Sequence, residues 1–520
     1  MVRAGTDVVA RTARTATVPA VVTVVLAWAL ALPRLVPNTF GDHGTFVSVA
    51  ERLFAGDRLY VDVWDNKDPL FYYVLALGRL VSPLADVAVE VLWVLVAGLS
   101  VAVIATAAGA SRTLALVAGF AGTPLLLTGP AYETGMTHLP GLALLLAATS
   151  CAVRSRWLAA GVLVGLLLLT KLILTPVAAA GLLVVALHRR REGGLAGLLR
   201  AFAGSLALLA LGVGAMWLRG ELPGWLDNFR LNADYADGDL AASQYGSVVG
   251  HLLRAFPDDG RGAGAVTIAA LVVVLVAVPR SWTRPGSTDT QEAAGISATS
   301  ESGSEPEAAA RPRTVAPAVL WDLVVVALLV GVVVIAVTAT FPHHAQTLSA
   351  AGGFALALVA TRLSGTVVRW RAPLLLLLAG YLTAGALHPY VTFTAARGMS
   401  TSLQSLQRNS PESAVLDSRP GVRTYARAGT NDVNAHAVGL HGVELVCPRF
   451  HQYSLDSAAI LDQTAACLPR ADALIVDDSV RIQAQEPEWN AYVARVRALV
   501  ASGYDCVRAT GSQVCFRRAP

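Results

Sequence analysis

The sequence predicts a polytopic α-helical membrane protein with a small α/β domain at its C-terminal end. Of its 520 residues, 54% are hydrophobic and only 15% are charged, whereas a soluble protein of this length carries about a quarter charged residues. Many apolar runs approach the ~20 residues that a helix needs to cross a bilayer. After about residue 390 the apolar runs become short and alternate with polar residues, as in a soluble domain. The lipid bilayer is therefore the first expected partner.

About eleven membrane spans can be placed in the first 390 residues. They cover residues 18–36, 88–108, 113–127, 136–153, 157–170, 172–187, 201–218, 263–278, 317–338, 345–361 and 372–388. If these spans alternate, the Arg clusters beside them all fall on one side, and the positive-inside rule makes that side the cytoplasm. We therefore expect a multi-pass plasma-membrane protein with a cytoplasmic N-terminus and an extracytoplasmic C-terminus. Topology already explains the Arg residues, so the net charge of +4 does not indicate nucleic-acid binding, and we expect no nucleic-acid partner.

The spans divide the chain into a membrane domain, residues 1–390, and an extracytoplasmic α/β domain, residues 391–520. The first outer loop covers residues 37–87, and a long outer loop covers 219–262. Residues 281–315 are rich in Ser, Glu, Ala and Gly. Such a composition cannot bury an apolar face, which predicts a disordered cytoplasmic linker. Near the C-terminus, a helical pattern over residues 488–502 precedes two short strands joined by a turn.

Four of the five cysteines lie in the predicted outer domain. An even number of cysteines in an extracytoplasmic domain indicates disulfides. Cys506 and Cys515 flank the predicted hairpin and can pair across it, which leaves Cys447 to pair with Cys467. Buried free thiols remain the alternative. A zinc site is disfavoured, because the spacings lack the close Cys pairs of structural zinc sites.

The first outer loop carries the most specific motif of the chain. An acidic residue follows the first span, and after an amphipathic stretch the loop reads G-x-x-x-Y-x-D-x-W-D-x-K-x-P-L. This pattern resembles the GT-C glycosyltransferases, in particular the protein O-mannosyltransferases, the lipid A aminoarabinose transferases and their bacterial relatives. The matching residues are Asp42, Gly44, Ala50, Gly56, Tyr60, Asp62, Trp64, Asp65, Lys67, Pro69 and Leu70. Weaker likenesses are the Gly-rich helix that ends at Lys171 and the segment that starts at Phe341.

The resemblance implies a GT-C-like fold and an enzyme that moves a sugar from a polyprenyl-phosphate donor. The acceptor would be a cell-envelope glycan, lipid or protein at the outer face, and the transfer would be a single inverting displacement. Asp42 is then the candidate general base, with a helix N-cap as the structural alternative. Lys67, Lys171, His343 and His344 are candidates for binding the donor phosphate. Surface pairing of Lys67, snorkelling of Lys171 and an interfacial role of the histidines are the alternatives.

Further substrate-binding candidates are His43, Tyr60, Trp64, Asp65 and Glu133, although aromatic residues at a membrane interface are often only anchors. Residues 46–55 have apolar positions on one face, which predicts a helix lying on the membrane surface. Two positions depart from the family pattern. His43 stands where many relatives have a second acidic residue, and Asp68 stands where many have Pro. A divalent metal therefore remains open as a cofactor, and no other cofactor is expected.

Two other functions remain possible from the sequence. The first is a membrane transporter or lipid-carrier flippase, although the charges gather in outer loops and no internal repeat is evident. The second is a non-catalytic GT-C relative that assists envelope assembly, an alternative that the changed position His43 keeps open.

Overall fold

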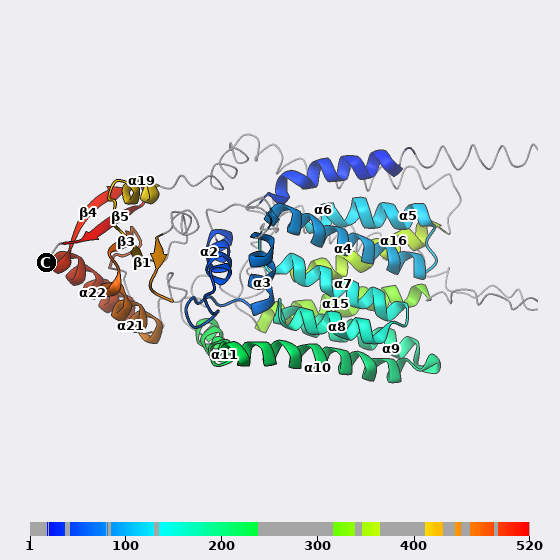
Figure 1. Ribbon diagram of the computed structural model, residues 1–520. Helices are drawn as coiled ribbons and strands as arrows, with labels where there is room; N and C mark the ends of the chain where they lie inside the picture. The colour runs from blue at the N-terminus through cyan, green and yellow to red at the C-terminus, as the bar shows by residue number, and fades with distance from the viewer. Residues whose placement is uncertain are drawn as a thin grey trace, which may run out of the picture.

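The computed structural model describes residues 18, 20–36, 42–79, 81, 85–128, 135–237, 316–337, 346–364, 411–429, 443–448, 458–482 and 487–518. Within these residues the chain is mostly helical. A bundle of apolar helices forms one end of the molecule, and a small sheet with its own helices forms the other (Figure 1). The predicted spans 263–278 and 372–388 and the predicted linker 281–315 lie outside the described residues.

The bundle consists of helices that match apolar runs of the sequence. Four described helices are long and apolar enough to cross a membrane: α4 (Ala85–Ala107), α10 (Gly194–Arg219), α15 (Pro317–Val337) and the helix Gln346–Ser364, which contains α16 (Ser349–Ser364). Shorter apolar helices pack with them: Ala20–Leu35, Arg112–Leu127, α7 (His138–Val153), α8 (Trp157–Leu168) and Leu172–His188, which ends in α9 (Thr175–His188). Composition predicts a helical membrane protein, and the described residues form several apolar helices in agreement with that prediction.

Small residues let the helices of the bundle approach closely. A Cβ atom on Gly161 of α8 would lie 1.8 Å from the carbonyl oxygen of Ala201 on α10. Lipid tails are as apolar as the side chains, so helices in a membrane associate through such close backbone contacts. A larger residue at position 161 would separate these two helices.

Helix α2 (Asp42–Phe54) and helix α3 (Pro69–Arg79) lie across the end of the bundle that faces the sheet (Figure 1). The prediction that the helix of residues 46–55 lies on the membrane surface with one apolar face was wrong. Residues 43–50 of α2 are all buried, whereas Phe54 is exposed. The reason is that the sheet covers the second side of α2, where Tyr425 and Leu445 share an apolar cluster with Phe46.

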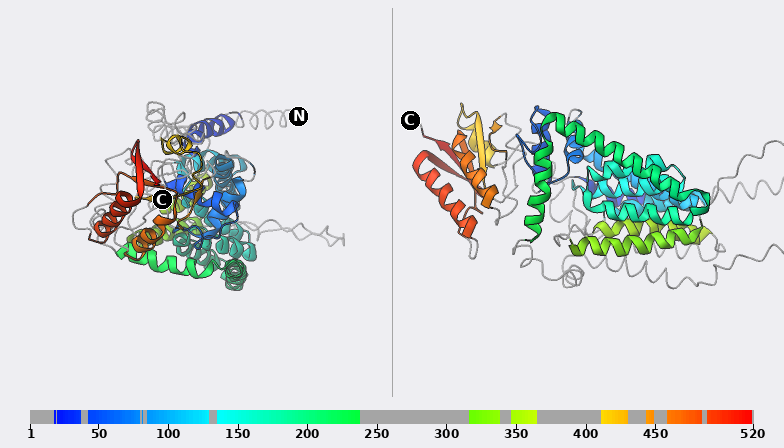
Figure 2. Two further views of the ribbon diagram at one scale, coloured as in Figure 1. Left: turned by 60° about the vertical axis from the view of Figure 1, so that its left-hand side comes forward. Right: turned by 90° about the horizontal axis from the view of Figure 1, so that it is seen from below.

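Two helices stand where the sequence predicted loops. Helix α3 follows the motif of the first outer loop, and helix α11 (Leu222–Asp237) follows α10 directly. Helix α11 runs across the end of the bundle, between the bundle and the sheet (Figure 2, right). Both helices therefore flank residues 55–68, the part of the first outer loop that carries most of the motif.

The sheet has five strands in the order β2-β1-β3-β5-β4. Strands β2 (Glu444–Leu445), β1 (Thr424–Ala428) and β3 (Ala473–Asp477) are parallel, and β5 (Ser512–Arg517) and β4 (Tyr504–Ala509) continue the sheet antiparallel. Alternate residues of the strands point to opposite faces. One face packs on α21 (Ala458–Cys467) and α22 (Pro487–Gly503), and the other faces α2. Helix α22 and the β4–β5 hairpin occur where the sequence placed them.

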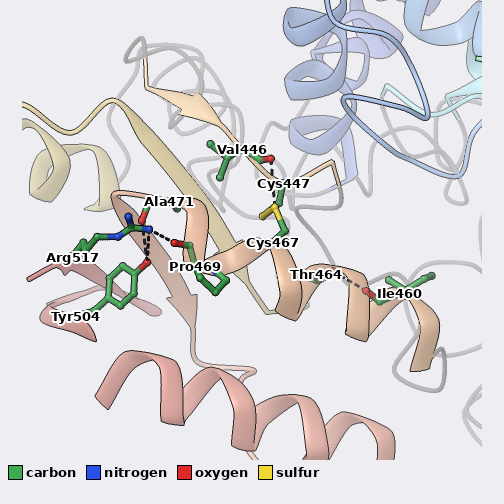
Figure 3. Close-up of a disulfide and its surroundings, with 9 residues drawn as sticks. All are labelled: Val446, Cys447, Ile460, Thr464, Cys467, Pro469, Ala471, Tyr504 and Arg517. Carbon is green, nitrogen blue, oxygen red and sulfur yellow. Dashed lines mark hydrogen bonds between the residues drawn. A yellow bond between two sulfur atoms is a disulfide. The ribbon is translucent and has the colours of Figure 1, made fainter. Parts of the chain in front are cut away.

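Two disulfides tie the sheet region together. Cys506 and Cys515 face each other across the β4–β5 hairpin, and Cys447, just after β2, is bonded to Cys467 at the end of α21. These are the pairs that the sequence suggested. Figure 3 shows the second disulfide, with the Cys467 sulfur close to the carbonyl oxygen of Val446. The strand β2 is thereby fixed to the helix that leads into β3.

Candidate functional site

The loop between α2 and α3 is held by backbone hydrogen bonds to two distant parts of the chain. The Leu70 N–H donates to the carbonyl oxygen of Leu169, in the turn after α8, at 2.9 Å. The Trp64 N–H donates to the carbonyl oxygen of Pro448, which follows Cys447 in the sheet region, at 2.7 Å. The motif-bearing loop is therefore clamped between the helical bundle and the sheet region.

Asp65 lies inside this loop with its side chain only 1% exposed. Its carboxylate accepts the Lys67 N–H at 3.2 Å, and its backbone carbonyl accepts the Asn228 side chain of α11 at 3.1 Å. These bonds give Asp65 a positioning role, because they fix the backbone that carries Lys67. Trp64, also a predicted substrate-binding residue, is buried beside it in the same apolar cluster as Phe46.

Tyr60 adopts a backbone conformation that is rare for a non-glycine residue, with φ at 65°. Its hydroxyl donates to the carbonyl oxygen of Lys67 at 2.7 Å, and Gly224 of α11 packs against it so closely that a Cβ there would lie 2.5 Å from the Tyr60 Cβ. Such strain persists only when surrounding contacts hold it. Burial, and then the charges of Asp68 and other nearby carboxylates, raise the pKa of Tyr60 well above its usual value, so its hydroxyl stays a donor.

The two lysines predicted to bind phosphate come from different parts of the chain, and the charges of both act on the Asp68 carboxylate. The Lys67 Nζ atom lies 2.9 Å from the Asn66 side-chain oxygen and 5.4 Å from the ring centroid of Phe46 on α2. Lys171 lies in the extended turn that follows α8 and is 9% exposed. A Cβ on Gly141 of α7 would lie 3.0 Å from the Lys171 Cβ. The Lys171 backbone is thus held firmly against the bundle.

Asp68 joins these two lysines. Its carboxylate accepts the Leu172 N–H at 3.1 Å. Burial raises the pKa of Asp68 above its usual value. It outweighs the hydrogen bonds from Leu172 and the Trp225 side chain and the charges of Lys171 and Lys67, which lower the pKa. The sequence marked Asp68 only as a departure from the family pattern and did not predict it as a member of the site.

His43 lies in a separate, buried position. Its Nε2 atom is 3.3 Å from the Asp86 carboxylate in the first turn of α4, and both side chains are almost fully buried. Gly135 packs against the ring, because a Cβ there would lie 1.9 Å from the His43 Nδ1 atom. This pair fixes the beginning of α2 to the bundle, and Asp86 had no distinguishing signal in the sequence.

A second buried carboxylate fixes the other side of the loop. Glu221 is fully buried and accepts the Leu59 N–H at 3.1 Å, the Tyr73 hydroxyl at 2.7 Å and the Arg219 Nε–H at 2.7 Å. The negative charge of Glu221 is compensated by Arg219, since a buried charge is tolerated only when it is paired and hydrogen-bonded. Glu221 therefore links the α10–α11 junction to the loop and to α3.

The remaining predicted site residues are only partly described. Asp42 is the first residue of α2, one helical turn before Phe46. Glu133, His343 and His344 lie outside the described residues. In the part of the chain that the structure describes, no three His, Cys, Asp or Glu side chains gather as a metal site.

A small, mainly apolar pocket is lined by Thr170, the residue before Lys171. Its lining includes Leu70 and Phe71 of α3, Glu90 and Trp93 of α4, and Pro140 of α7. Leu70 likewise follows the Asp68-Pro69 segment. The pocket thus adjoins the two segments that carry Lys67 and Lys171, and the Glu90 carboxylate group belongs to its lining.

Comparison with solved structures identifies the fold. Crystal structures of ArnT from Cupriavidus metallidurans match the chain in two states, bound to undecaprenyl phosphate and apo, with TM-scores of 0.54 and 0.55. The first match covers 97% of this chain and 98% of ArnT at 14% identity, and the second covers 96% and 98% at 15% identity. ArnT is an aminoarabinose transferase of the GT-C type. The chain has a GT-C fold.

A GT-C fold is what the loop motif implied. The oligosaccharyltransferase AglB from Archaeoglobus fulgidus, in complex with an inhibitory peptide and a dolichol-phosphate, matches at 12% identity with a TM-score of 0.46 over 96% of this chain and 74% of AglB. A TM-score below 0.5 does not establish a shared fold. No family model and no curated protein matches the sequence. The likeness to ArnT therefore identifies the fold of this chain and does not identify its reaction.

Proposed function

We propose that this protein is an integral membrane glycosyltransferase that uses a polyprenyl-phosphate sugar as its donor. The acceptor is a glycan, a lipid or a protein of the cell envelope, and the reaction takes place at the outer face of the plasma membrane. Lys67 and Lys171 bind the donor phosphate, and Asp42 is the general base. The fold shared with ArnT, which was crystallised with undecaprenyl phosphate, supports this proposal.

The observation that carries the proposal is the meeting of Lys67 and Lys171 at Asp68. The two lysines come from segments more than a hundred positions apart, and hydrogen bonds between the segments hold them in place. The small pocket lined by Leu70 and Thr170 adjoins the same two segments. A polyprenyl phosphate has a charged head on a long apolar chain, so two lysines at the end of a bundle of apolar helices suit it.

The proposed reaction is a single displacement at the anomeric carbon of the sugar. The acceptor oxygen forms a bond to that carbon while the bond from the carbon to the phosphate oxygen breaks. The electron pair of the broken bond passes to the phosphate, and the hydroxyl proton passes to Asp42. Attack from the side opposite the leaving phosphate inverts the configuration. The lysines stabilise the negative charge that develops on the leaving phosphate.

The position of Asp42 is compatible with this role. It begins α2, one turn before Phe46, whose ring lies beneath the ammonium group of Lys67. The base and the phosphate-binding lysine thus belong to neighbouring segments at the same end of the bundle. The other predicted residues serve the site indirectly: Tyr60 and Asp65 hold the Lys67 backbone, and His43 holds the start of α2.

The outer location is supported by the disulfides of the sheet region. The bonds Cys447–Cys467 and Cys506–Cys515 persist only in an oxidising compartment. The sheet region contacts the first loop directly through Trp64 and Pro448. The loop and its lysines therefore belong on the same outer side of the membrane.

The decisive experiment measures sugar transfer by purified protein given radiolabelled polyprenyl-phosphate sugars and membrane acceptors. We expect Asp42→Asn to abolish transfer. The control variant is Asp505→Asn, which changes an exposed carboxylate paired with Arg518 in the sheet and should retain transfer. Undiminished transfer by Asp42→Asn would remove Asp42 as the base. No transfer with any donor would favour a transporter, a flippase or a non-catalytic relative.

The orientation has its own test. Ala55 follows the end of α2 and lies on an exposed turn, so Ala55→Cys offers a reactive thiol on the first loop. We expect membrane-impermeant thiol reagents to label this variant from outside intact cells. Labelling only after the cytoplasm is opened would contradict the proposed topology.

A further inference from the structure

A group of exposed arginines lies at the end of the bundle that faces away from the sheet, where helices α8 and α10 begin (Figure 1). Arg154 and Arg156 belong to the turn that precedes α8, and Arg200 lies in the second turn of α10. None of these three arginines forms an ion pair with a carboxylate group in the part of the chain that the structure describes. Their guanidinium groups are therefore available to an anionic ligand.

Close packing of α8 on α10 brings arginines from the two helices together. A Cβ atom on Gly197 of α10 would lie 2.3 Å from the Trp157 Nε1 atom, so the indole ring packs directly on the glycine. Arg156 precedes Trp157, and Arg200 follows Gly197 by three positions. Residues three apart are neighbours on the surface of a helix. Arg156 and Arg200 therefore belong to the same small area of the surface.

The turn before α8 is held in an uncommon conformation. Ser155 has φ at 60°, which is rare for a residue other than glycine and persists only where surrounding contacts impose it. Its Oγ atom accepts a hydrogen bond from Arg189 at the end of α9, and Arg189 also pairs with Glu192 at 3.6 Å. These contacts fix the backbone that carries Arg154 and Arg156, and they engage the nearest acidic side chain of the neighbouring turn elsewhere.

Exposed apolar side chains lie beside the arginines. Leu158 of α8 is 60% exposed, and Leu199 and Phe202 of α10 are 71% and 66% exposed. Helix α10 is long and apolar enough to cross a membrane, so such side chains face the acyl chains of lipids. Cations at the end of a lipid-facing surface lie at the level of the lipid head groups. The surface thus combines the two chemistries of a phospholipid.

We propose that the adjoining ends of α8 and α10 bind an anionic phospholipid. Arg154, Arg156 and Arg200 bind its charged head group, because a guanidinium group matches the geometry of a phosphate. Leu158 and Phe202 contact its acyl chains. The lipid belongs to the leaflet opposite the first loop, which is the cytoplasmic leaflet in the proposed orientation. The inference does not depend on the proposed reaction, since the site lies at the other end of the bundle from Lys171.

Topology alone makes a different prediction from a binding site. The positive-inside rule explains why arginines lie at this end of the helices, and through the surface potential it gives each exposed arginine a similar influence on lipid. A binding site makes the influence local. Arg112 provides the comparison, because it is exposed at the start of α5 (Arg112–Val117), which packs on α4 and α16.

The test measures lipid binding to the purified full-length protein by native mass spectrometry. The probes are phosphatidylglycerol, which is anionic, and phosphatidylcholine with the same acyl chains. We expect the wild type to prefer phosphatidylglycerol. The double variant Arg156→Gln/Arg200→Gln should bind it about thirtyfold more weakly, because each arginine near an anionic head group contributes a factor of about five. Arg156→Lys/Arg200→Lys, which retains both charges, should keep the preference, and Arg112→Gln should bind as the wild type does.

Three outcomes would overturn the inference. The first is equal binding of the two lipids by the wild type. The second is a loss of affinity in Arg112→Gln as large as in Arg156→Gln alone, which would leave only a general surface potential. The third is binding of glycerol phosphate as tight as that of phosphatidylglycerol, which would make the ligand a soluble anion. If the double variant does not fold, Arg154→Gln in the exposed turn provides the test, with an expected loss of about fivefold.

Discussion

The carboxylate of Asp68 accepts the backbone N–H of Leu172 at 3.1 Å, although the two residues are 104 positions apart. This bond closes the end of the first loop onto the turn between α8 and α9. Lys67 precedes one partner and Lys171 precedes the other, so the bond also fixes the spacing of the two lysines. The geometry of the candidate site depends on this closure more than on either helix alone.

Lys171 is expected to contribute strongly to ligand binding. Replacing it by Met retains the apolar stem and removes the ammonium group. We expect the affinity for a short-chain polyprenyl phosphate to fall by a factor of about ten to a hundred, because one desolvated charge partner of the phosphate is lost. Arg191→Met, which removes an exposed cation beyond α9, is the control and should bind normally. Unchanged binding by Lys171→Met would contradict a phosphate site at this lysine.

Gly135 is expected to tolerate no side chain. Its φ of +75° disfavours other residues, and a Cβ atom would lie 1.9 Å from the His43 Nδ1 atom. Gly135→Ala should lower the free energy of unfolding in detergent by about 2 kcal/mol or more. In a His43→Ala background the same substitution should cost only the ~1 kcal/mol backbone term. A cost that is equal in both backgrounds would show that the two residues are not in contact.

The buried carboxylate of Glu221 is expected to stabilise the loop. Glu221→Gln removes the charge that Arg219 neutralises and places an amide beside the Leu59 and Tyr73 donors. We expect a loss of about 2–4 kcal/mol in the free energy of unfolding, as for other broken buried pairs. Asp62→Asn breaks an exposed pair and should cost at most about 1 kcal/mol. Similar costs for the two variants would contradict the buried network.

Asp472 should make the sheet region sensitive to acid. Burial acts to raise the pKa of Asp472, but hydrogen bonds from Thr424 and the Arg423 amide and the charge of Arg517 outweigh burial, so the pKa is lowered. A lowered pKa in the folded state contributes stability above the unfolded value of about 3.9 and loses it as the pH falls further. The thermal stability of the wild type should therefore exceed that of Asp472→Asn at pH 6, and the difference should shrink towards pH 3. A constant difference would contradict this assignment.

The helices of the bundle could be predicted because apolar runs report directly on burial in a membrane. Helices α3 and α11 were missed, although both carried a signal in a proline at their first or second position, Pro69 and Pro223. Their mixed polar and aromatic composition resembled a loop. The apolar pattern of α2 predicted burial of one face only. The sheet that covers the other face is formed by the last part of the chain, so the local sequence of α2 could not predict it.

The candidate site was predictable only where a motif marked it. Lys67 and Lys171 were identified in the sequence, but their approach to each other was not. Asp68, Asp86 and Glu221 acquire their roles from partners that are distant in sequence, namely Leu172, His43 and Tyr73. A carboxylate that is buried by the docking of two elements has no local signature. Such residues can be found only after the elements have been placed.

The bond between the Trp64 amide and the Pro448 carbonyl has a consequence for biogenesis. The ribosome makes the first loop early, yet the residue that completes its hydrogen bonding follows roughly 380 positions later, and segments made so far apart must find each other after synthesis. The hydrogen bonding of the loop therefore stays incomplete until the sheet region has been synthesised and folded. A chain that ends before Pro448 would lack the hydrogen bond to Trp64. The candidate site is therefore expected to form only after the whole protein has been synthesised.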